Sequence, residues 1–409
     1  MALHTQQNHP PAKRLGEIDW DDESQLLALV EQCVDQKREF NREFEQQAFR
    51  NAAWYMGYQD LFLSGRSGAL KRLANPANRV RLIYNLIKPA VNQLVAVLGF
   101  NPIRFEVLPA TDDLEDADVA RRDTAVMNDA QERLNFASLI SLNDLQTIVA
   151  AMSFLKVCWN PFGGAPRDLV RELGLEDEEP AEIRRIFKGF EPFEEVGALE
   201  VFVRPVSCVY WGPPGSQFDE ADWVLDINER SRDYVSQHYD IDPEELASDY
   251  ETLSETYRVS DIRPNGQITR HQPDLDKLLV RELWVRRNSD YAPRGRHVVS
   301  VLGKLLRTQE NPYWHREIPL VPFYFWRLAD NCYPVSDVSD MLGPQSDFNK
   351  NKSQQSEVRE LSSNPFILYQ FGSIRNFDEW NSRPGGMRSY HGPTAPQVVP
   401  GQSIPNSMV

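Results

Sequence analysis

The sequence predicts an α+β fold with N-terminal helices, a middle region of strands and a long polar helix near the C-terminus. Three observations support this fold class in a chain of 409 residues. Between residues 25 and 154, apolar side chains recur mainly at helical spacing. Between residues 200 and 306, short runs alternate apolar and polar side chains, so we expect a mixed sheet. Residues 345–361 then have a helical composition with few apolar positions.

Residues 1–19 are polar and contain two adjacent prolines, so we expect a disordered N-terminal arm. Acidic residues then open a helix, because negative charge is favourable at the positive end of the helix dipole. Its inner face is marked by Leu26, Leu27, Val30, Cys33 and Val34. From Phe40 to Tyr55 the apolar face becomes aromatic, which predicts helix packing rather than a ligand site.

The next elements follow in order. Residues 90–100 have a helical pattern that ends at a Gly-Phe-Asn-Pro sequence. Residues 103–108 alternate like a strand. Helices are predicted over residues 117–134 and 139–154, and the second of these leads into a strand at residues 155–159.

A strongly acidic stretch at residues 165–197 predicts an exposed insertion rather than a second core. Beyond it, strands are expected at residues 200–211, 222–227, 277–287 and 296–306. Ser231 is expected to cap a short helix that ends near Tyr239.

An apolar run with two prolines, Glu317–Phe323, predicts an edge strand, since proline cannot donate a hydrogen bond inside a sheet. Ser336 or Asp337 is then expected to cap a short helix. Gly343-Pro344 is expected to end that helix and to start a second one over about 345–361. Because the second helix has so few apolar side chains, we expect neighbouring copies or solvent to face it.

Composition excludes several classes of protein. The chain has 60 acidic and 44 basic residues, a formal charge of −16, which argues against general affinity for nucleic acid. The four cysteines are widely spaced and form no CxxC pair, as expected of reduced thiols in a reducing compartment. No apolar run has the length of a bilayer span and no signal peptide is recognisable, so no membrane association is expected.

The sequence contains no motif of the common catalytic or metal sites. It has neither a GxxxxGK[ST] phosphate loop nor a GxSxG nucleophile turn. His238, His271, His297 and His315 have no metal-ligand spacing to another His or Cys. Adjacent carboxylates are abundant and predict solvated surface. We therefore assign no catalytic, cofactor-binding or metal-binding residues.

Four stretches occur in an order that resembles the portal proteins, or head-to-tail connectors, of tailed bacteriophages, most closely those of short-tailed phages. These are Arg50–Gly57, Tyr84–Pro89, Asp219–Val224, and a run with Pro319–Phe323, Gly343-Pro344-Gln345, Asn349-Lys350 and Ser353. Each stretch is short, and the specificity lies in their shared order. The resemblance spans most of residues 25–409.

The resemblance implies a portal-like division of the chain. Residues 20–334 would form the wing, residues 335–363 the descending stem helix and residues 364–409 the start of a small β-rich clip. Within the last range, Phe366–Tyr369 predicts a strand before sequence dense in Gly, Pro, Asn and Ser. The second stem helix, tunnel loop and crown of the family would follow, but the sequence ends at Val409.

The function that the resemblance implies is structural and non-enzymatic, with no cofactor. Twelve subunits would form a homo-oligomeric ring at one capsid vertex of the virion, after assembly in the host cytoplasm. The ring would be the channel for packaging and ejection of double-stranded DNA, and would contact the major capsid protein, the terminase motor and tail adaptor proteins.

Two alternatives belong to other classes. An intracellular hydrolase with an unrecognised carboxylate site would need convergent Ser, His or metal spacings, which are missing. A capsid-internal scaffold or adaptor would predict a mostly helical chain with few aromatic residues, whereas this chain has 9 tryptophans and many strand patterns.

Polar residues of the stem helix are the candidates for lining the channel or contacting the next subunit: Gln345, Asn349, Lys350, Lys352, Glu357 and Arg359. Basic side chains repeated around a ring would face DNA phosphates, or would pair with Glu357 or Glu360 of a neighbour. We favour pairing, since an isolated belt of like charges repels itself. Candidates for docking the motor or tail through the clip are Arg375, Trp380, Arg383 and Arg388.

Overall fold

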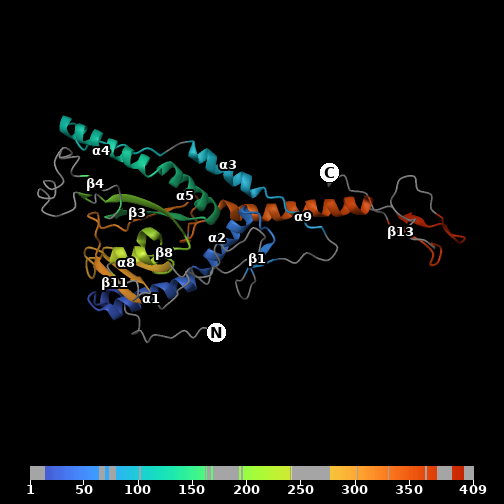
Figure 1. Ribbon diagram of the computed structural model, residues 1–409, viewed down its shortest axis with the longest axis horizontal. Helices are drawn as coiled ribbons and strands as arrows, with labels where there is room; N and C mark the ends of the chain where they lie inside the picture. Colours follow the sequence, from blue (N-terminus) through green and yellow to red (C-terminus); the bar gives the residue numbers. More distant parts are fainter. Residues whose placement is uncertain are drawn as a thin grey trace, which may run out of the picture.

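The computed structural model describes most of the chain (Figure 1). The described residues are 14–63, 70–72, 80–100, 103–161, 163, 167–168, 193–194, 197–239, 241, 277–301, 303–329, 331–363, 366–374 and 389–399. Helices and antiparallel sheets form a body, from which helix α9 (Asp337–Ser363) extends toward strand β13 (Phe366–Leu368). The α+β fold class is therefore confirmed.

The predicted helices of the N-terminal region are present: α1 (Glu23–Phe40), α2 (Arg42–Tyr55), α3 (Ile87–Gly99), α4 (Leu114–Arg133) and α5 (Phe136–Ala150). The carboxylate of Asp22 begins α1 by accepting the backbone N–H groups of Ser24 and Gln25 at 3.0 and 3.4 Å. The strand expected at residues 103–108 does not form. That segment runs beside α4 instead, where Val107 N donates to Thr124 Oγ1 at 3.0 Å.

The N-terminal end of the body begins earlier than the sequence suggested. Leu15–Glu17 form a short 3₁₀ helix, η1, and Ile18 and Trp20 are buried in a core cluster. Trp20 Nε1 donates to the carbonyl of Tyr291 at 2.9 Å. Residues 14–19 therefore pack on the sheet and are not part of a disordered arm, while residues 1–13 lie outside the described residues.

A five-stranded sheet has the order β11-β10-β9-β8-β7. Its strands are β7 (Val209–Gly212), β8 (Trp223–Ser231), β9 (Lys277–Val285), β10 (Arg296–Val301) and β11 (Lys304–Glu310). The single strand predicted over residues 296–306 is wrong. It is a hairpin, because Gly303 adopts a φ of 73°, which turns the chain back so that Val301 pairs with Lys304.

A second sheet has the order β12-β3-β6, with β3 (Ser153–Asn160) between β6 (Ala198–Pro205) and β12 (Leu320–Phe323). The proline-containing strand β12 lies at the edge, as predicted. Every pairing among the described strands is antiparallel, so the expected mixed sheet is not found. The pairs β7–β8, β9–β10 and β10–β11 are neighbours both in the chain and in the sheet, an arrangement that is typical of antiparallel strands.

Shorter elements complete the described chain. Ser231 caps α8 (Arg232–Tyr239) as predicted, since its Oγ accepts the N–H of Tyr234 at 3.3 Å. Three two-residue or three-residue strand pairs are β1 (Leu61–Leu63) with β2 (Leu70–Arg72), β4 (Arg167–Asp168) with β5 (Phe193–Glu194), and β13 with β14 (Gln397–Val399). Most of the acidic stretch at residues 165–197 lies outside the described residues.

Three of the four core clusters among the described residues join the larger elements, and the fourth packs Val235 of α8 on the five-stranded sheet. In the first, α1 packs on the five-stranded sheet through Leu26 and Val30 against Leu225 and Leu283. In the second, rings of Phe154, Trp211 and Phe218 pack between the sheets, with centroids 5.3–6.0 Å apart. The third cluster joins α3, α5 and α9 through Ile87, Val91, Ile148 and Val338, and it anchors the projecting helix to the body.

Candidate functional site

The root of α9 is fixed by one serine and one valine. Ser336 Oγ accepts the backbone N–H of Val338 at 3.1 Å, which caps the helix as predicted. The same hydroxyl lies 2.7 and 2.8 Å from the carbonyl oxygens of Ile148 and Val149 at the end of α5. Val338 is fully buried among apolar residues. The helix therefore leaves the body in a fixed direction.

The interruption predicted at Gly343-Pro344 does not occur, because α9 continues through Pro344. Proline removes one N–H donor and crowds the preceding turn, while the hydrogen bonds on either side persist. Before it, Val338 is held in the core, and after it Gln345 is buried and hydrogen-bonded. Tertiary contacts on both sides of Pro344 hold the two halves in one helix.

An extended segment, residues 80–86, lies along α9, and we call it the strap. Alternate strap N–H groups donate to α9 side chains: Leu86 to Gln345 Oε1 at 3.1 Å, Tyr84 to Asn349 Oδ1 at 3.0 Å and Leu82 to Ser353 Oγ at 2.9 Å. Four helical residues rise about 6.0 Å and two extended residues span about 6.6 Å. These repeats nearly match, so three successive bonds stay in register.

The amide side chains of this face continue into a network toward α2. Asn349 Nδ2 donates to Gln59 Oε1, and Gln59 Nε2 donates to Asn85 Oδ1 at 3.2 Å. Asn85 Nδ2 donates in turn to the carbonyl of Tyr55 at 2.9 Å. We expected neighbouring copies or solvent to satisfy the polar side chains of this helix. For Gln345 and Asn349 that expectation is wrong, since the chain's own strap and α2 region satisfy them.

The charged candidates on α9 lie elsewhere on the helix. Lys350 and Arg359 are exposed, whereas Lys352 and Glu357 are half-buried. Lys352 Nζ lies 5.6 Å from the centroid of the Phe348 ring, a cation–π distance. None of the ion pairs between described residues includes these four charged side chains. Their pairing with a second subunit therefore stays a prediction.

The other predicted site residues fall in the region after β13. Arg375, Trp380, Arg383 and Arg388 lie outside the described residues. Their role in docking stays a prediction.

A buried charged cluster joins the two sheets, and sequence reasoning missed it. Lys156 Nζ lies 2.8 Å from both Asp226 Oδ2 and Glu282 Oε2. Arg204 contacts the other oxygen of Asp226 at 2.8 Å, and His297 Nε2 lies 3.6 Å from Glu282. The sequence signal was a lysine inside a strand with otherwise apolar neighbours, which demands a buried partner.

Electrostatics explains how this cluster is tolerated. Burial alone would lower the pKa of Lys156, but Asp226 and Glu282 outweigh it and raise that pKa. Burial opposes ionisation of Glu282, yet the Lys156 charge and the His297 contact hold the pKa of this carboxyl well below its usual range. Burial lowers the pKa of His297. With that histidine neutral, two cations balance two anions, so the cluster ties β3 and β6 to β8 and β9 without net charge.

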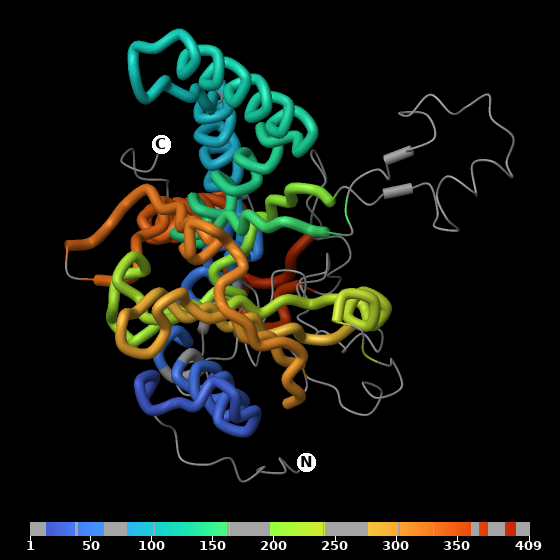
Figure 2. Tube along the Cα trace, turned by 90° about the vertical axis from the view of Figure 1, so that its left-hand side faces the viewer, coloured from blue at the N-terminus to red at the C-terminus, as the bar shows by residue number. Residues whose placement is uncertain are grey.

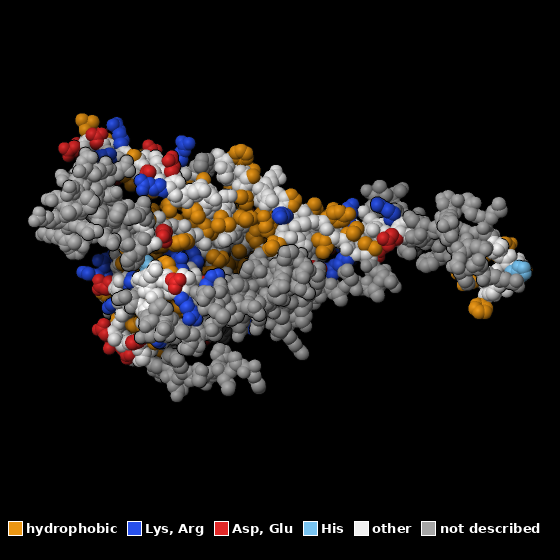
Figure 3. Space-filling view, in the orientation of Figure 1, with side chains coloured by type: hydrophobic (Ala, Val, Ile, Leu, Met, Phe, Trp, Pro, Cys, Tyr) orange, Lys and Arg blue, Asp and Glu red, His pale blue; other side chains and the backbone are white. Residues whose placement is uncertain are grey.

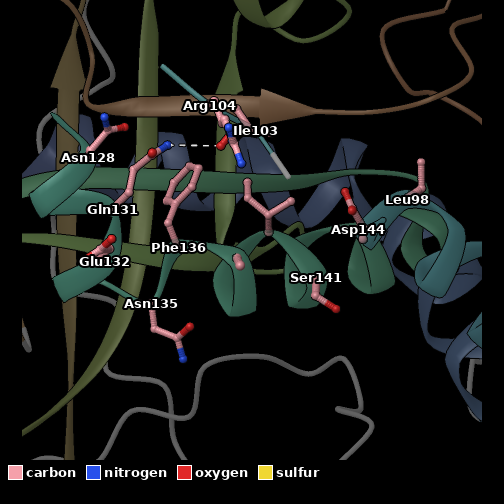
Figure 4. A pocket seen from close by; sticks show the side chains of 13 residues that line it. Leu98, Ile103, Arg104, Asn128, Gln131, Glu132, Asn135, Phe136, Ser141 and Asp144 are labelled. Atoms are coloured by element: carbon pink, nitrogen blue, oxygen red, sulfur yellow. Dashed lines mark hydrogen bonds between the residues drawn. The ribbon is translucent and has the colours of Figure 1, made fainter. Parts of the chain in front are cut away.

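A pocket of about 680 Å³ lies where α3, the segment after it and the α4–α5 junction meet (Figure 4). Gln131 Nε2 donates across it to the carbonyl of Ile103 at 3.3 Å. Burial raises the pKa of Asp144 at its edge. The lining includes Ser141 but no histidine, cysteine or lysine, so it does not assemble an activated nucleophile of the usual kind.

The described part of the chain also bears on metal binding and on membrane spanning. No group of three or more His, Cys, Asp or Glu side chains there could hold a metal ion. None of the helices in the described ranges combines the length and apolar character needed to cross a bilayer.

Comparison with known proteins agrees with the architecture. No curated protein matches the chain. The family described as phage P22-like portal protein matches residues 37–409, which include both larger sheets, α9 and the strands beyond it but leave out most of α1. The resemblance seen in the sequence is thereby confirmed, and the chain belongs to the phage P22-like portal protein family.

Proposed function

We propose that this portal protein forms a closed ring of twelve subunits at one capsid vertex, through which double-stranded DNA is packaged and later ejected. The observation that carries the proposal is α9: a 27-residue helix anchored at its root and braced by the strap, extending well beyond the body (Figure 1). A long helix that keeps an exposed face among the described residues is suited to stand beside copies of itself around an axis.

In this proposal, residues 20–334 form the wing, residues 335–363 the stem and residues 364–409 the start of the clip. The clip, with Arg375, Trp380, Arg383 and Arg388, docks the terminase motor and then tail adaptor proteins, while the wing meets the major capsid protein. Assembly takes place in the host cytoplasm. The ring performs no enzymatic step, because its task is to guide DNA and to join the parts of the virion.

The charged residues of α9 have a specific role in the proposed stem. Lys350 and Arg359 are exposed and lack an ion-pair partner among the described residues of their own chain. Pairing with Glu357 or Glu360 of the next subunit would neutralise the belt of like charges that a ring creates. Direct contact with DNA phosphates is the alternative for the same side chains.

The test is the mass of the purified protein by light scattering, followed by negative-stain imaging. We expect ring-shaped particles with a central hole and a mass near twelve chains. If the protein is a monomer under conditions in which its unfolding transition shows that it is folded, the proposal is refuted. If rings form, Lys350→Gln and Lys352→Gln then separate the two roles: loss of assembly indicates pairing, whereas normal rings with slower DNA packaging indicate phosphate contact.

A further inference from the structure

Exposed large apolar side chains occur on several elements, and two groups of them lie near the root of α9. The strap-side patch consists of Ile83, Tyr84 and Leu86 of the strap with Leu94 and Val97 of α3. The loop-side patch consists of Phe325, Trp326 and Leu328, in the segment that leads into α9. Each of these eight side chains is between 40 and 60% exposed. Clusters of this kind on a folded surface mark interaction sites, whereas scattered single residues do not.

The strap contacts α9 through its backbone, and its apolar side chains in the strap-side patch remain exposed. Strap N–H groups donate inward to α9, so the side chains of Tyr84 and Leu86 stay exposed beside it. In α3, only Ile87 and Val91 are buried, although no charged residue follows Lys88 in this helix. Apart from Asn92 and Gln93, the residues after Lys88 are apolar, so the outer face of α3 carries apolar side chains that the described part of the chain leaves exposed.

The loop-side patch is held in place at the N-terminal end of α9. Trp326 forms an antiparallel bridge with Val335, and its Nε1 donates to Asp337 Oδ1 at 2.9 Å. Arg327 Cζ lies 4.6 Å from the centroid of the Tyr324 ring, and the neighbouring Phe325, Trp326 and Leu328 are exposed. These contacts hold the exposed apolar side chains of the loop-side patch in place.

The two patches lie on different faces of α9, and the α3 part of the strap-side patch is nearest in level to the loop-side patch, because Val91 of α3 shares a core cluster with Val338, the neighbour of Asp337. At roughly 100° per residue, the strap-binding side chains at 345, 349 and 353 point about 80–160° away from Asp337. Figure 3 shows apolar side chains spread over α3 and the root of α9 on the face toward the viewer. In Figure 2 the orange segment before α9 forms the left-hand edge, which is the face turned away in Figure 3.

We propose that the loop-side patch of one subunit docks on the strap-side patch of a second copy of this chain. The inference rests on the proposed ring and adds where its subunits meet. A closed ring needs two different faces on each subunit that meet after rotation about one axis. Figure 1 views the chain down its shortest axis, and the proposal places the neighbouring copy along that direction, so that the broad faces of the two subunits meet. A rotation about the ring axis brings the loop-side patch against the α3 part of the strap-side patch and removes both from water.

The direct test places a photoreactive residue in the loop-side patch. Trp326 is replaced by p-benzoylphenylalanine, and chains labelled with ¹⁴N and ¹⁵N are mixed before assembly, so that mass spectrometry separates contacts between subunits from contacts within one. We expect crosslinks from position 326 to peptides within residues 80–100 of a different chain. The matched control is Trp314, which is 91% exposed but outside both patches, and should give no such peptides.

Two charge substitutions provide an independent readout. Leu328→Asp leaves the hydrogen bond of Trp326 intact, and Val97→Asp changes an exposed position of α3, so both variants should fold with an unchanged unfolding transition. We expect each to lower the fraction of chain in rings at least tenfold, while Val126→Asp on the exposed surface of α4 does not.

The outcomes separate this inference from the proposed function. Rings whose crosslinks from position 326 map to other surfaces, or only within one chain, would overturn the docking inference and leave the ring intact. Failure of the unmodified full-length protein to form rings would overturn both.

Discussion

The strap is the feature whose contribution can be worked out most fully, and Gln345→Met is the sharpest perturbation. Gln345 is 4% exposed, accepts the N–H of Leu86 at 3.1 Å and donates to the carbonyl of Tyr84 and to Asn349 Oδ1. Methionine keeps the length of the side chain but removes both polar functions. It leaves a strap donor and a strap acceptor without their partners.

Each hydrogen bond contributes about 1 kcal/mol net, and an unsatisfied buried group costs about 1–3 kcal/mol. We therefore expect the strap to lose about 2 kcal/mol of local stability, equivalent to roughly 30-fold faster amide exchange where local opening controls it. Hydrogen exchange measured on peptides covering residues 80–88 tests this value. Most of the body should keep its protection, because its clusters lie elsewhere.

The matched control is Gln354→Met, at an exposed position of the same helix. It should leave exchange in the strap unchanged within about twofold, since the side chain makes none of the bonds to the strap. Unchanged exchange at Leu86 in the Gln345 variant would refute the reasoning. It would show that the strap is held by its apolar side chains rather than by the helix amides.

Further predictions concern the buried cluster and the continuity of α9. Lys156→Met leaves two buried carboxylates without their cation and should lower the free energy of unfolding in denaturant by about 3–5 kcal/mol. Lys88→Met, at an exposed site, should lower it by under about 0.5 kcal/mol. Burial lowers the pKa of His297, so the unfolded state takes up the proton first and stability falls as pH drops below about 6.5; His297→Gln should flatten that dependence. The Lys156 charge, acting against burial, lowers the pKa of Glu282, so its stabilising effect is present above about pH 4.5 and is lost as pH falls toward the folded pKa; Glu282→Gln should remove this acid-sensitive part of the unfolding free energy. Pro344→Ala should raise the melting temperature and add about 1–3 kcal/mol, because α9 is continuous there; a destabilised variant would mean that the helix needs its proline.

Much of the fold was predictable because local patterns report local structure. The apolar spacing of residues 26–34 predicted helix α1. Ser231 and Ser336 correctly predicted the starts of the helices that they cap. The two prolines of residues 317–323 indicated an edge strand, and β12 lies at an edge. Such features depend on neighbouring residues and on backbone chemistry, which the sequence displays directly.

Errors arose where distant contacts overrode local preference. Gly343-Pro344 is a plausible helix break in isolation, but core packing before it and strap bonds after it keep α9 continuous. Residues 103–108 alternate like a strand, but lie beside α4 and pair with no other strand among the described residues. Residues 14–19 have an arm-like composition, although Ile18 packs into the core.

The sequence by itself determined the α+β class, the order of most elements and the family, because these depend on periodicity, capping residues and motifs in a fixed order. Only the tertiary structure decided what the polar residues of α9 bind and where Lys156 finds its carboxylates. Gln345 lies about 260 residues from the strap and Lys156 lies 70 and 126 residues from Asp226 and Glu282. Nothing within one helix or strand specifies such partners, since hydrogen bonds and ion pairs depend on distance in space and become strong only after folding has excluded water.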